Sequence, residues 1–449
     1  MKEVKLYLGV LFIIILSFPT ICKGQVSSNE TKETEDKIQN LLSRMTLKEK
    51  AAQMQMLGLP AVFTGGYWDA RDSVVWDVEK FQKYIVEYGI GSIHNTPGYP
   101  AQPEEWYEII KMIQDSIMEK SRLGIPTLYG IDNIHGANYV LGSVMFPHQI
   151  AMAATWNRDL TKQSAAITSY ESRAASLPYN FNPNADVSPE PLWGRISESF
   201  GEDPYLISEM TSAYIAGSQE KGLQDSTSNA ICVKHFLGYG GGRNGKDRAN
   251  AVIPEINLRQ YYLPPFEQAV KNGAMSIMIS SNAVNGIPCH INEYYITDIL
   301  KGELGFKGVV VSDFVDVDNL TYAHNTAKDK REATKQAVNA GLDLIMDPFN
   351  VDLVDIIVDL VEKGEIAESR IDDAVTRVLR LKYYLNLFDM PYNNPKGYTE
   401  IGSEEHIEVN YRAASEAITL LKNTDAILPL SGEEKVLVTG YTANSINLL

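Results

Sequence analysis

Cysteine is scarce in this chain, which has three cysteines among 449 residues. Cys22 lies close to the N-terminus, so the remainder of the chain has only Cys232 and Cys289. Two cysteines cannot build a disulfide framework, and they cannot hold a structural zinc ion by themselves. Cys232 lies in an apolar, strand-like run and is predicted to be a small buried residue of the core. A single disulfide bridge between the two stays open.

Basic residues are few relative to acidic ones: 40 Lys and Arg against 57 Asp and Glu, for a net charge of −17. Nucleic-acid binding requires clustered cations that neutralise phosphates, so nucleic acid is excluded as an expected partner. The same charge argues against anionic membranes and polyanionic substrates, and it leaves neutral substrates open. The length and the hydrophobic fraction of 44% fit a large globular domain with a remainder.

Long hydrophobic runs are also missing. The apolar run at residues 6–16 is shorter than the ~18–20 residues that cross a bilayer, and it follows Lys2 and Lys5. With Gly24 at a plausible cleavage site, residues 1–24 are predicted to be a signal peptide, so the protein is expected to be exported, either periplasmic or secreted. A lipid anchor at Cys22 is an alternative, although Ile21 fits a lipoprotein signal poorly; a buried helix is another. No membrane span is predicted elsewhere.

Short apolar runs alternate with amphipathic stretches along most of the chain. Strand, helix and strand at such spacing indicate parallel βαβ units, and seven or eight of them favour a (β/α)8 barrel of the α/β class over an open sheet. The predicted strands are residues 89–93, 126–131, 177–181, 230–236, 275–280, 308–311 and 342–346. The predicted helices include residues 103–120, 159–175, 259–272, 331–340, 365–387 and 407–422.

Domain boundaries follow from the loop signals after the last predicted barrel helix. The barrel is predicted over residues 25–390, and a Pro- and Asn-rich loop then begins a linker and helix at residues 391–430. Residues 435–440 are predicted to be the first strand of a second α/β domain that occupies residues 431–449. Because one strand cannot make a sheet, the sequence is expected to be truncated within this domain.

Polar residues follow several predicted strands at the point where each strand ends. Asp132 follows one strand, Asp186 follows another, Lys234 and His235 end a third, and Asp313 follows a fourth. Polar residues collect wherever strands end, so one such residue would carry no information. Several together predict an active site at the C-terminal ends of the barrel strands.

Five sequence blocks resemble glycoside hydrolase family 3, of the β-glucosidase type, and they follow one another in the order found in that family. They are GIDNIHG at 130–136, WGR with ESFGEDPYL at 193–206, VKHFLGYG at 233–240, VNGIP at 284–288 and LGFKGVVVSDF at 304–314. The resemblance implies a (β/α)8 barrel and a retaining glycosidase, which uses one carboxyl group as nucleophile and a second as acid/base.

Asp313 matches the nucleophile of the family. A carboxylate at the end of a buried strand is held in position for attack, and a nearby Lys234 would keep it ionised. The alternative is an aspartate that only caps the following helix.

The resemblance also places Asp132, Arg195, Lys234 and His235 in the pocket that binds the terminal sugar, where their charged groups would bind hydroxyls. Arg195 could instead form a structural ion pair, and His235 could be an ordinary buried histidine. Phe314 stands where the family often has Trp and would stack on the leaving sugar, with ordinary packing as the alternative. Asp186 and Glu198 are interpreted mainly as scaffold.

The sequence departs from the family at the acid/base. In two-domain members this residue is a glutamate of the second domain, so it is expected beyond residue 449. Single-domain β-N-acetylglucosaminidases use an Asp-x-His in the loop after the Lys-His strand; here that loop has Asp247 but Ala249, which makes that subfamily a poor match. Ser281 stands near where members can carry a tyrosine.

The loop at 240–249 contains a GxGxxG pattern at Gly240, Gly242 and Gly245. A dinucleotide site would need this pattern to open a helix, whereas a polar stretch that ends at Pro254 follows it, so an active-site loop is the better interpretation. No cofactor and no metal are expected.

The predicted function is an exported exo-acting β-glucosidase that removes terminal glucosyl residues of oligosaccharides. Two alternatives stay open: another exo-glycosidase of the family, such as a β-xylosidase or a β-N-acetylglucosaminidase, and a sugar-binding fragment that does not turn over. Linkage preference and oligomeric state are not predicted.

Overall fold

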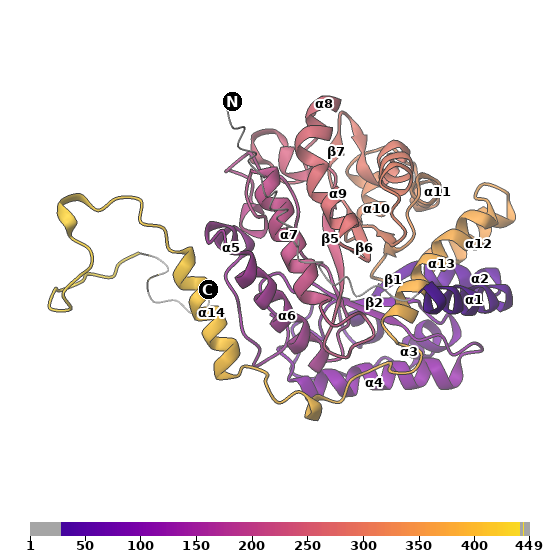
Figure 1. Ribbon diagram of the computed structural model, residues 1–449. Helices are drawn as coiled ribbons and strands as arrows, with labels where there is room; N and C mark the ends of the chain where they lie inside the picture. The colour runs from indigo at the N-terminus through magenta and orange to yellow at the C-terminus, as the bar shows by residue number, and fades with distance from the viewer. Residues whose placement is uncertain (1–27, 441–442, 444–449) are drawn as a thin grey trace, which may run out of the picture.

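The computed structural model describes residues 28–440 and 443 (Figure 1). The predicted signal peptide at 1–24, with Cys22, lies outside the described residues, as do positions 444–449. Among the helices of the described part, none is both long and apolar enough to cross a membrane.

Eight parallel strands form a ring at the centre of the molecule, in the spatial order β10, β1, β2, β3, β4, β5, β6, β9. A parallel bridge between Val311 and Leu344 joins β9 to β10, and the N–H of Ser312 donates to the Leu344 carbonyl at 2.9 Å. The ring is the predicted (β/α)8 barrel. Its strands are β1 (Gln55–Gly58), β2 (Ser92–His94), β3 (Leu128–Ile131), β4 (Tyr179–Asn180), β5 (Ala230–Phe236), β6 (Ser276–Ile279), β9 (Val309–Val311) and β10 (Ile345–Met346).

Seven of these strands coincide with the predicted apolar runs, and β5 has the predicted bounds. The sequence pattern misses β1, because its four residues follow almost directly on a helix and begin with a polar residue. Gln55 is buried there because its side-chain amide donates to the Asp347 carbonyl at 3.0 Å. A small hairpin of β7 (Ala283–Val284) and β8 (Ile287–Pro288) follows β6 outside the ring.

Helices surround the ring, as the outer ribbons of Figure 1 show. They bury their apolar faces against the strands, and α4 and α6 lie where the periodicity predicts them, within one residue at each end. The helices are α1 (Ser28–Arg44), α2 (Leu47–Gln53), α3 (Val78–Phe81), η2 (Gln82–Glu87), α4 (Pro103–Lys120), α5 (Gln149–Ala154), α6 (Arg158–Ala174), α7 (Pro204–Ser218), α8 (Glu255–Asn257), η6 (Leu258–Tyr262), α9 (Pro264–Lys271), η8 (Tyr294–Glu303), α10 (Asp316–Tyr322), α11 (Lys330–Ala340), α12 (Asp352–Glu362), α13 (Glu368–Tyr384) and α14 (Glu404–Ala417).

The predicted helix at 259–272 is divided into η6 and α9. Pro264 and Pro265 explain the division, since proline has no N–H to donate to the preceding turn and its ring crowds that turn. A proline is tolerated in the first turn of a new helix, so α9 begins at Pro264.

The chain beyond α14 differs from the prediction in two ways. The helix expected to reach residue 422 ends at Ala417, and the strand expected at 435–440 is absent from the described residues there. Val436, Leu437 and Val438 are exposed along an extended path that projects away from the barrel in Figure 1. The physical reason is the one that makes a lone strand unstable: within the described part of the chain, no neighbouring strand lies beside these residues to pair with them.

The core has two parts. One part lies between the ring and the helices, and the other fills the inside of the ring with side chains such as Met56, Tyr179 and Met278. Cys232 belongs to the inner part, as predicted, and Cys232 and Cys289 are both buried free thiols rather than a disulfide.

Candidate active site

Charged side chains gather at the C-terminal ends of the strands. Asp132 follows β3, Lys234 and His235 lie near the end of β5, and Asp313 follows β9. Because parallel strands of a closed ring point the same way, their ends meet at one face, which is where barrel enzymes hold their chemistry. The structure therefore brings together residues that are 181 positions apart in sequence, from Asp132 to Asp313 (313 − 132).

Asp132 and Lys234 form an ion pair across this face, with Nζ of Lys234 2.6 Å from Oδ1 of Asp132. The lysine side chain is 3% exposed and the aspartate side chain 44% exposed. Burial alone would lower the pKa of the Lys234 ammonium, but the Asp132 carboxylate outweighs burial and raises that pKa. The Asp132 carboxylate is thus exposed to solvent and held in place by the buried Lys234 ammonium.

Asp313 is held by three neighbours. Its Oδ1 accepts the N–H of Phe314 at 2.6 Å, its Oδ2 accepts the hydroxyl of Ser281 at 2.8 Å, and its own N–H donates to Nε2 of His290 at 3.2 Å. Burial works to raise the pKa of the Asp313 carboxyl, but the Arg195 guanidinium and these donors outweigh it and hold that pKa below its ordinary value. The carboxylate is ionised and oriented.

His235 faces Asp313 with Nε2 at 3.7 Å from Oδ2, and its Nδ1 lies 2.7 Å from Oδ2 of Asp186. Burial raises the pKa of Asp186 to about 8, and burial with the nearby cations lowers the pKa of His235 well below its usual range. Asp186, interpreted as scaffold from the sequence, contacts Nδ1 and thus orients the imidazole with Nε2 toward Asp313.

Arg195 forms a two-pronged pair with Glu198, with distances of 2.8 and 2.7 Å from Nε and Nη2 to the two carboxylate oxygens. Its guanidinium also lies over the ring of Tyr239, 5.5 Å from the centroid. This is the ion pair that the sequence left open as an alternative. The pair orients the guanidinium beside the site, where its charge acts on Asp313.

Phe314 belongs to an aromatic wall beside the nucleophile. Its ring centroid lies 5.7 Å from that of Trp68 and 6.1 Å from that of Phe349. Trp68 is 71% exposed and comes from the loop after β1, while Phe349 follows β10. Since β9, β10 and β1 are neighbours in the ring, their three loops lie side by side.

Sequence reasoning missed several residues of this face. Trp68 follows β1, which has no separate apolar run in the sequence. His290 lies two residues beyond the family-like block VNGIP at 284–288 and is not part of it. Asp316 lies three residues after Asp313 on α10, where a second aspartate after the strand end is the available signal. Arg248, in the loop after β5, donates to Asp316 at 2.5 Å.

The glycine-containing loop after β5 folds into two short 3₁₀ turns, at Tyr239–Gly241 and Arg243–Gly245, rather than opening a long helix. Gly240 is required by close approach, since a Cβ there would come within 2.3 Å of the Val187 carbonyl oxygen. The indole N–H of Trp193 donates to Asp247 at 3.1 Å and holds the loop on the barrel.

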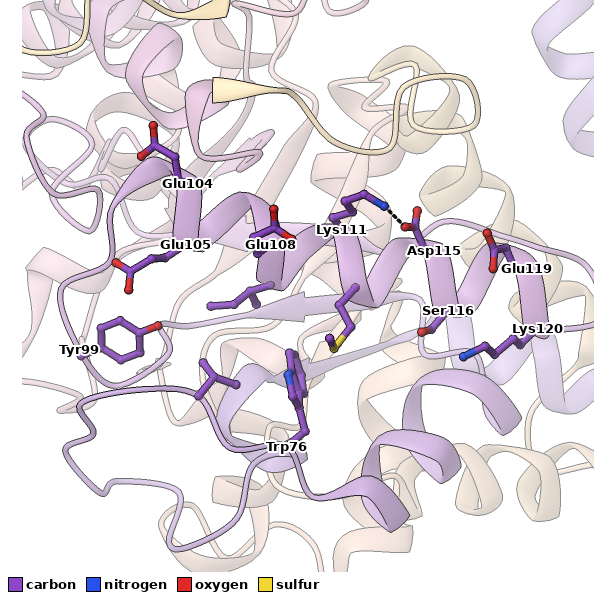
Figure 2. A pocket seen from close by; sticks show the side chains of 13 residues that line it. Trp76, Tyr99, Glu104, Glu105, Glu108, Lys111, Asp115, Ser116, Glu119 and Lys120 are labelled. Carbon is purple, nitrogen blue, oxygen red and sulfur yellow. Dashed lines mark hydrogen bonds and ion pairs between the residues drawn. The ribbon is translucent and has the colours of Figure 1, made fainter. Parts of the chain in front are cut away.

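A groove lies elsewhere, along the outer side of α4 (Figure 2). It measures about 670 Å³ and is lined by Trp76, Tyr99 and a row of charged side chains that includes an ion pair of Lys111 with Asp115. None of the predicted site residues line it. This groove reflects the outer surface of the barrel rather than the chemistry at the strand ends.

Comparison with known proteins gives the family. Residues 46–381 match the sequence model of the glycosyl hydrolase family 3 N terminal domain. A lysosomal beta glucosidase of Dictyostelium discoideum is 38% identical over 430 residues, which are 92% of this chain and 52% of that protein. A beta-xylosidase of Formosa agariphila is 38% identical over 337 residues, covering 72% of this chain and 46% of that protein.

A solved structure shares the fold. A mutant beta-glucosidase of Listeria innocua, in complex with laminaribiose, matches with a TM-score of 0.77 and 31% identity, over 88% of this chain and 53% of that one. The chain spans about half the length of the relatives that it matches. With the barrel, the five sequence blocks and these matches in agreement, the chain belongs to glycosyl hydrolase family 3 and contains its N-terminal domain.

Proposed function

We propose that this chain is the barrel part of a retaining exo-β-glucosidase, with Asp313 as the nucleophile. One observation carries the proposal: Asp313 is an oriented, ionised carboxylate on the same face as the Asp132–Lys234 pair. Such a site suits a neutral polyol with one electrophilic carbon. Lys234 supplies a buried cation, Asp132 an exposed carboxylate and Asp313 the nucleophile, all on one face of the barrel.

The terminal glucosyl residue would lie between Asp132 and Asp313. Asp132 accepts hydrogen bonds from two neighbouring hydroxyls, while the Lys234 ammonium and the Nε2–H of His235 donate to hydroxyl oxygens. Arg195 lies beside these groups and contributes positive charge. A sugar without these hydroxyls would leave buried charged groups unpaired, which is the physical source of selectivity.

In the first step, an oxygen of Asp313 attacks the anomeric carbon, a covalent glycosyl-enzyme forms, and the glycosidic oxygen departs with a proton from a general acid. In the second step, water attacks the same carbon, gives up its proton and releases Asp313. We assign the acid/base to the second domain of the whole protein, as the family resemblance implies, and not to a residue of this chain.

Phe314, Trp68 and Phe349 would contact the leaving group, since they lie next to the nucleophile and Trp68 offers an exposed indole face. The Listeria innocua protein was solved with laminaribiose, a disaccharide of glucose. We propose β-linked gluco-oligosaccharides as the substrate class. The domain boundaries at residues 24, 390 and 430, and export through the signal peptide, are part of the same proposal.

A β-xylosidase is the second candidate, because the Formosa agariphila relative carries that activity in its name. The test is a panel of 2,4-dinitrophenyl β-glycosides, whose leaving group departs without protonation, so that its release does not depend on a general acid. We expect one equivalent of dinitrophenol to be released fastest from the glucoside, more slowly from the xyloside and least from the N-acetylglucosaminide.

A faster release from the xyloside would favour the second candidate. Binding of glucose by calorimetry, with no release from any of the three and no covalent adduct by mass spectrometry, would instead identify a sugar-binding fragment. Circular dichroism of the same preparation confirms that the barrel is folded in either case.

A further inference from the structure

The groove along α4 is a second place with the size of a ligand site, and the proposed reaction does not use it (Figure 2). Its volume of about 670 Å³ lies within the range of about 300–1,000 Å³ that is usual for small-molecule sites. Val74 and Trp76 line it from the segment between β1 and α3, Tyr99 lines it from the segment between β2 and α4, and the other lining residues belong to α4. Along the helix the lining runs from Glu104 to Lys120, a length of about 24 Å, so the groove is longer than a single sugar ring.

The groove begins beside the face that holds the candidate active site. A helix that follows a barrel strand starts at the C-terminal end of that strand, so the first turn of α4 and the loop with Tyr99 lie at this face. The other loop is shared, since it contains Trp68 of the aromatic wall and, eight residues later (76 − 68), Trp76. Arg71 joins the two loops, because its backbone N–H donates to the Gly98 carbonyl at 3.1 Å. The groove therefore leads away from the active-site face along the outside of the barrel.

Trp76 is a fixed aromatic side of the groove and points from its loop toward α4 (Figure 2). Its ring centroid lies 5.1 Å from that of Phe63 and 5.0 Å from that of Phe81, in edge-to-face geometry with both. The backbone is held as well, since Phe63 and Trp76 form an antiparallel bridge. The indole N–H of Trp76 has no hydrogen-bond partner among the described residues. An aromatic ring that is held in place before a ligand arrives loses little conformational entropy on binding.

Two hydroxyl groups of the groove also lack a partner. Neither the hydroxyl of Tyr99 nor that of Ser116 makes a hydrogen bond within the part of the chain that the structure describes, although Ser116 is buried. A helical serine can instead donate to the carbonyl four residues before it, as Ser208 does to Pro204 at 2.6 Å. Hydroxyl groups both donate and accept, so they suit a ligand that is itself rich in hydroxyls.

The charged lining excludes anions as ligands. Five carboxylates and two lysines line the groove, which gives a net charge of 2 − 5 = −3. One lysine and one carboxylate are already joined, in the ion pair of Lys111 with Asp115, and Lys120 supplies a further donor. Carboxylates accept charge-assisted hydrogen bonds from hydroxyls, and aromatic faces contact the apolar faces of sugar rings. Acidic charge would also fit a cationic peptide, but the neutral indole and hydroxyl groups and the presence of Lys120 favour a neutral sugar.

We propose that the α4 groove is a second, non-catalytic binding site for a β-linked gluco-oligosaccharide, with Trp76 as the stacking surface and Tyr99 and Ser116 as hydrogen-bonding groups. The class of sugar rests on the proposed function, whereas the site itself rests on the groove and its unpartnered groups. An oligosaccharide that is bound there stays close to the strand ends, which raises the effective concentration of its terminal residue at the active site.

The test is ¹⁹F NMR of the chain labelled with 5-fluorotryptophan, titrated with laminaritetraose and, separately, with cellotetraose. The chain has five tryptophans, and Trp76→Phe identifies the signal of Trp76. We expect this signal to shift and to saturate at millimolar sugar. It should keep the same midpoint in Asp132→Ala, in which sugar binding at the strand ends is weakened. The Trp68 signal reports the aromatic wall, so a Trp76 signal that saturates while Trp68 does not respond would separate this site from a failed active-site proposal.

Tyr99→Phe removes only a hydroxyl group that has no partner in the folded chain, so the variant should fold as the parent does. It should weaken binding of the tetrasaccharide, followed at the Trp76 signal, by about three- to tenfold. Tyr107→Phe is the matched control, because it makes the same change on α4 outside the groove, where the Tyr107 ring packs against Tyr392 at 5.6 Å. This variant should keep the midpoint of the parent.

A Trp76 signal that moves with neither tetrasaccharide would overturn the proposal. A shift that is present in the parent and lost in Asp132→Ala would also overturn it, because the signal would then report the active site. A shift with tetralysine but not with the sugars would instead identify an acidic site for a cationic peptide. Equal losses in Tyr99→Phe and Tyr107→Phe would show that the effect does not come from the groove.

Discussion

The barrel contains two buried clusters of charge, one at each end of its strands, and they differ in how their carboxylates are satisfied. At the N-terminal end, Asp343 precedes β10 and is completely buried. Its Oδ1 accepts hydrogen bonds from Lys301 at 2.7 Å and also from Arg370, and its Oδ2 accepts the N–H of Val310 at 2.9 Å. Each oxygen of Asp343 has a donor from the protein.

At the C-terminal end the carboxylates keep acceptor capacity. Asp132 uses Oδ1 for Lys234 and has a side chain that is 44% exposed, and Asp313 binds two donors and has a side chain that is 14% exposed. Both clusters contain ion pairs with a buried partner, so an ion pair alone does not distinguish the scaffold from the site. The hydrogen bonds distinguish them. A cluster whose carboxylate oxygens all have donors from the protein stabilises the fold, and a cluster whose oxygens can accept further hydrogen bonds can bind a ligand.

The largest expected effect of this contrast is on stability. Replacing Asp343 by Ala leaves Lys301 and Arg370 without their buried partner, which should lower the free energy of unfolding by about 3–5 kcal/mol. The matched change Asp313→Ala should cost less, because among the described residues no lysine or arginine forms an ion pair with Asp313 and would lose its buried partner. Urea unfolding followed by circular dichroism measures both. Equal losses would mean that the two clusters do not differ as described.

The next effect is on sugar binding. Asp132→Ala removes an acceptor for two hydroxyls, each a charge-assisted hydrogen bond of about 1.5–3 kcal/mol, so the affinity for glucose should fall by about 10²-fold or more. Calorimetric titration with glucose gives the affinity directly. Asp343→Ala, measured under conditions where it is folded, should bind glucose as the parent does. A parent-like affinity in Asp132→Ala would place the sugar elsewhere.

A third effect concerns pH. Asp347 follows β10, and its Oδ2 lies 2.6 Å from Nζ of Lys330; burial nevertheless raises the pKa of Asp347 to about 6. Because this folded-state pKa is above the unfolded value of about 3.9, the contribution of Asp347 to stability is present below about pH 4 and is lost as the pH rises through about 6. That loss amounts to about 2–3 kcal/mol.

In Asp347→Asn this loss cannot occur, so the variant should gain stability relative to the parent between about pH 4 and about pH 7. The thermal midpoint measured across this range shows it. Glu362→Gln, a change at an exposed residue near the other end of α12, is the control and should track the parent. A constant difference between Asp347→Asn and the parent over the range would exclude the raised pKa.

The smallest effect is at the aromatic wall. Trp68→Ala should weaken binding of laminaribiose by about five- to tenfold, corresponding to an aromatic contact of about 1 kcal/mol, and leave glucose affinity unchanged. Trp156→Ala is a matched control, since Trp156 is 73% exposed on the surface after α5 and Trp68 is 71% exposed. Equal effects of the two substitutions would contradict a specific contact at Trp68.

Much of the fold could be predicted, because apolar runs bounded by turn residues mark buried parallel strands. The limits have physical causes. β1 has no separate apolar run, and Pro264 divides a continuous amphipathic pattern. Residues 435–440 have the composition of a strand but pair with no strand among residues 28–440. Pairing partners are a property of the folded chain and not of a local segment.

The site could be predicted in outline, since Asp132, Lys234, His235 and Asp313 follow strand ends and do meet at one face. The sequence pattern does not show which hydrogen-bond donor of the site pairs with which acceptor. The role of Glu198 as the partner of Arg195, and that of Ser281 as a donor to Asp313, depend on rotamers and loop paths that periodicity does not encode. The catalytic assignment of Asp313 and the sugar contacts stay predictions.

The most direct measurement of the central claim is to trap the nucleophile. The chain is incubated with 2,4-dinitrophenyl 2-deoxy-2-fluoro-β-glucoside, which forms a long-lived glycosyl-enzyme on the residue that attacks, and peptide mass spectrometry locates the adduct. We expect one fluoroglucosyl group per chain, on the peptide that contains Asp313, and none in Asp313→Ala. An adduct on Asp132, Asp316 or another carboxylate, or no adduct on a folded chain that binds glucose, would contradict the account.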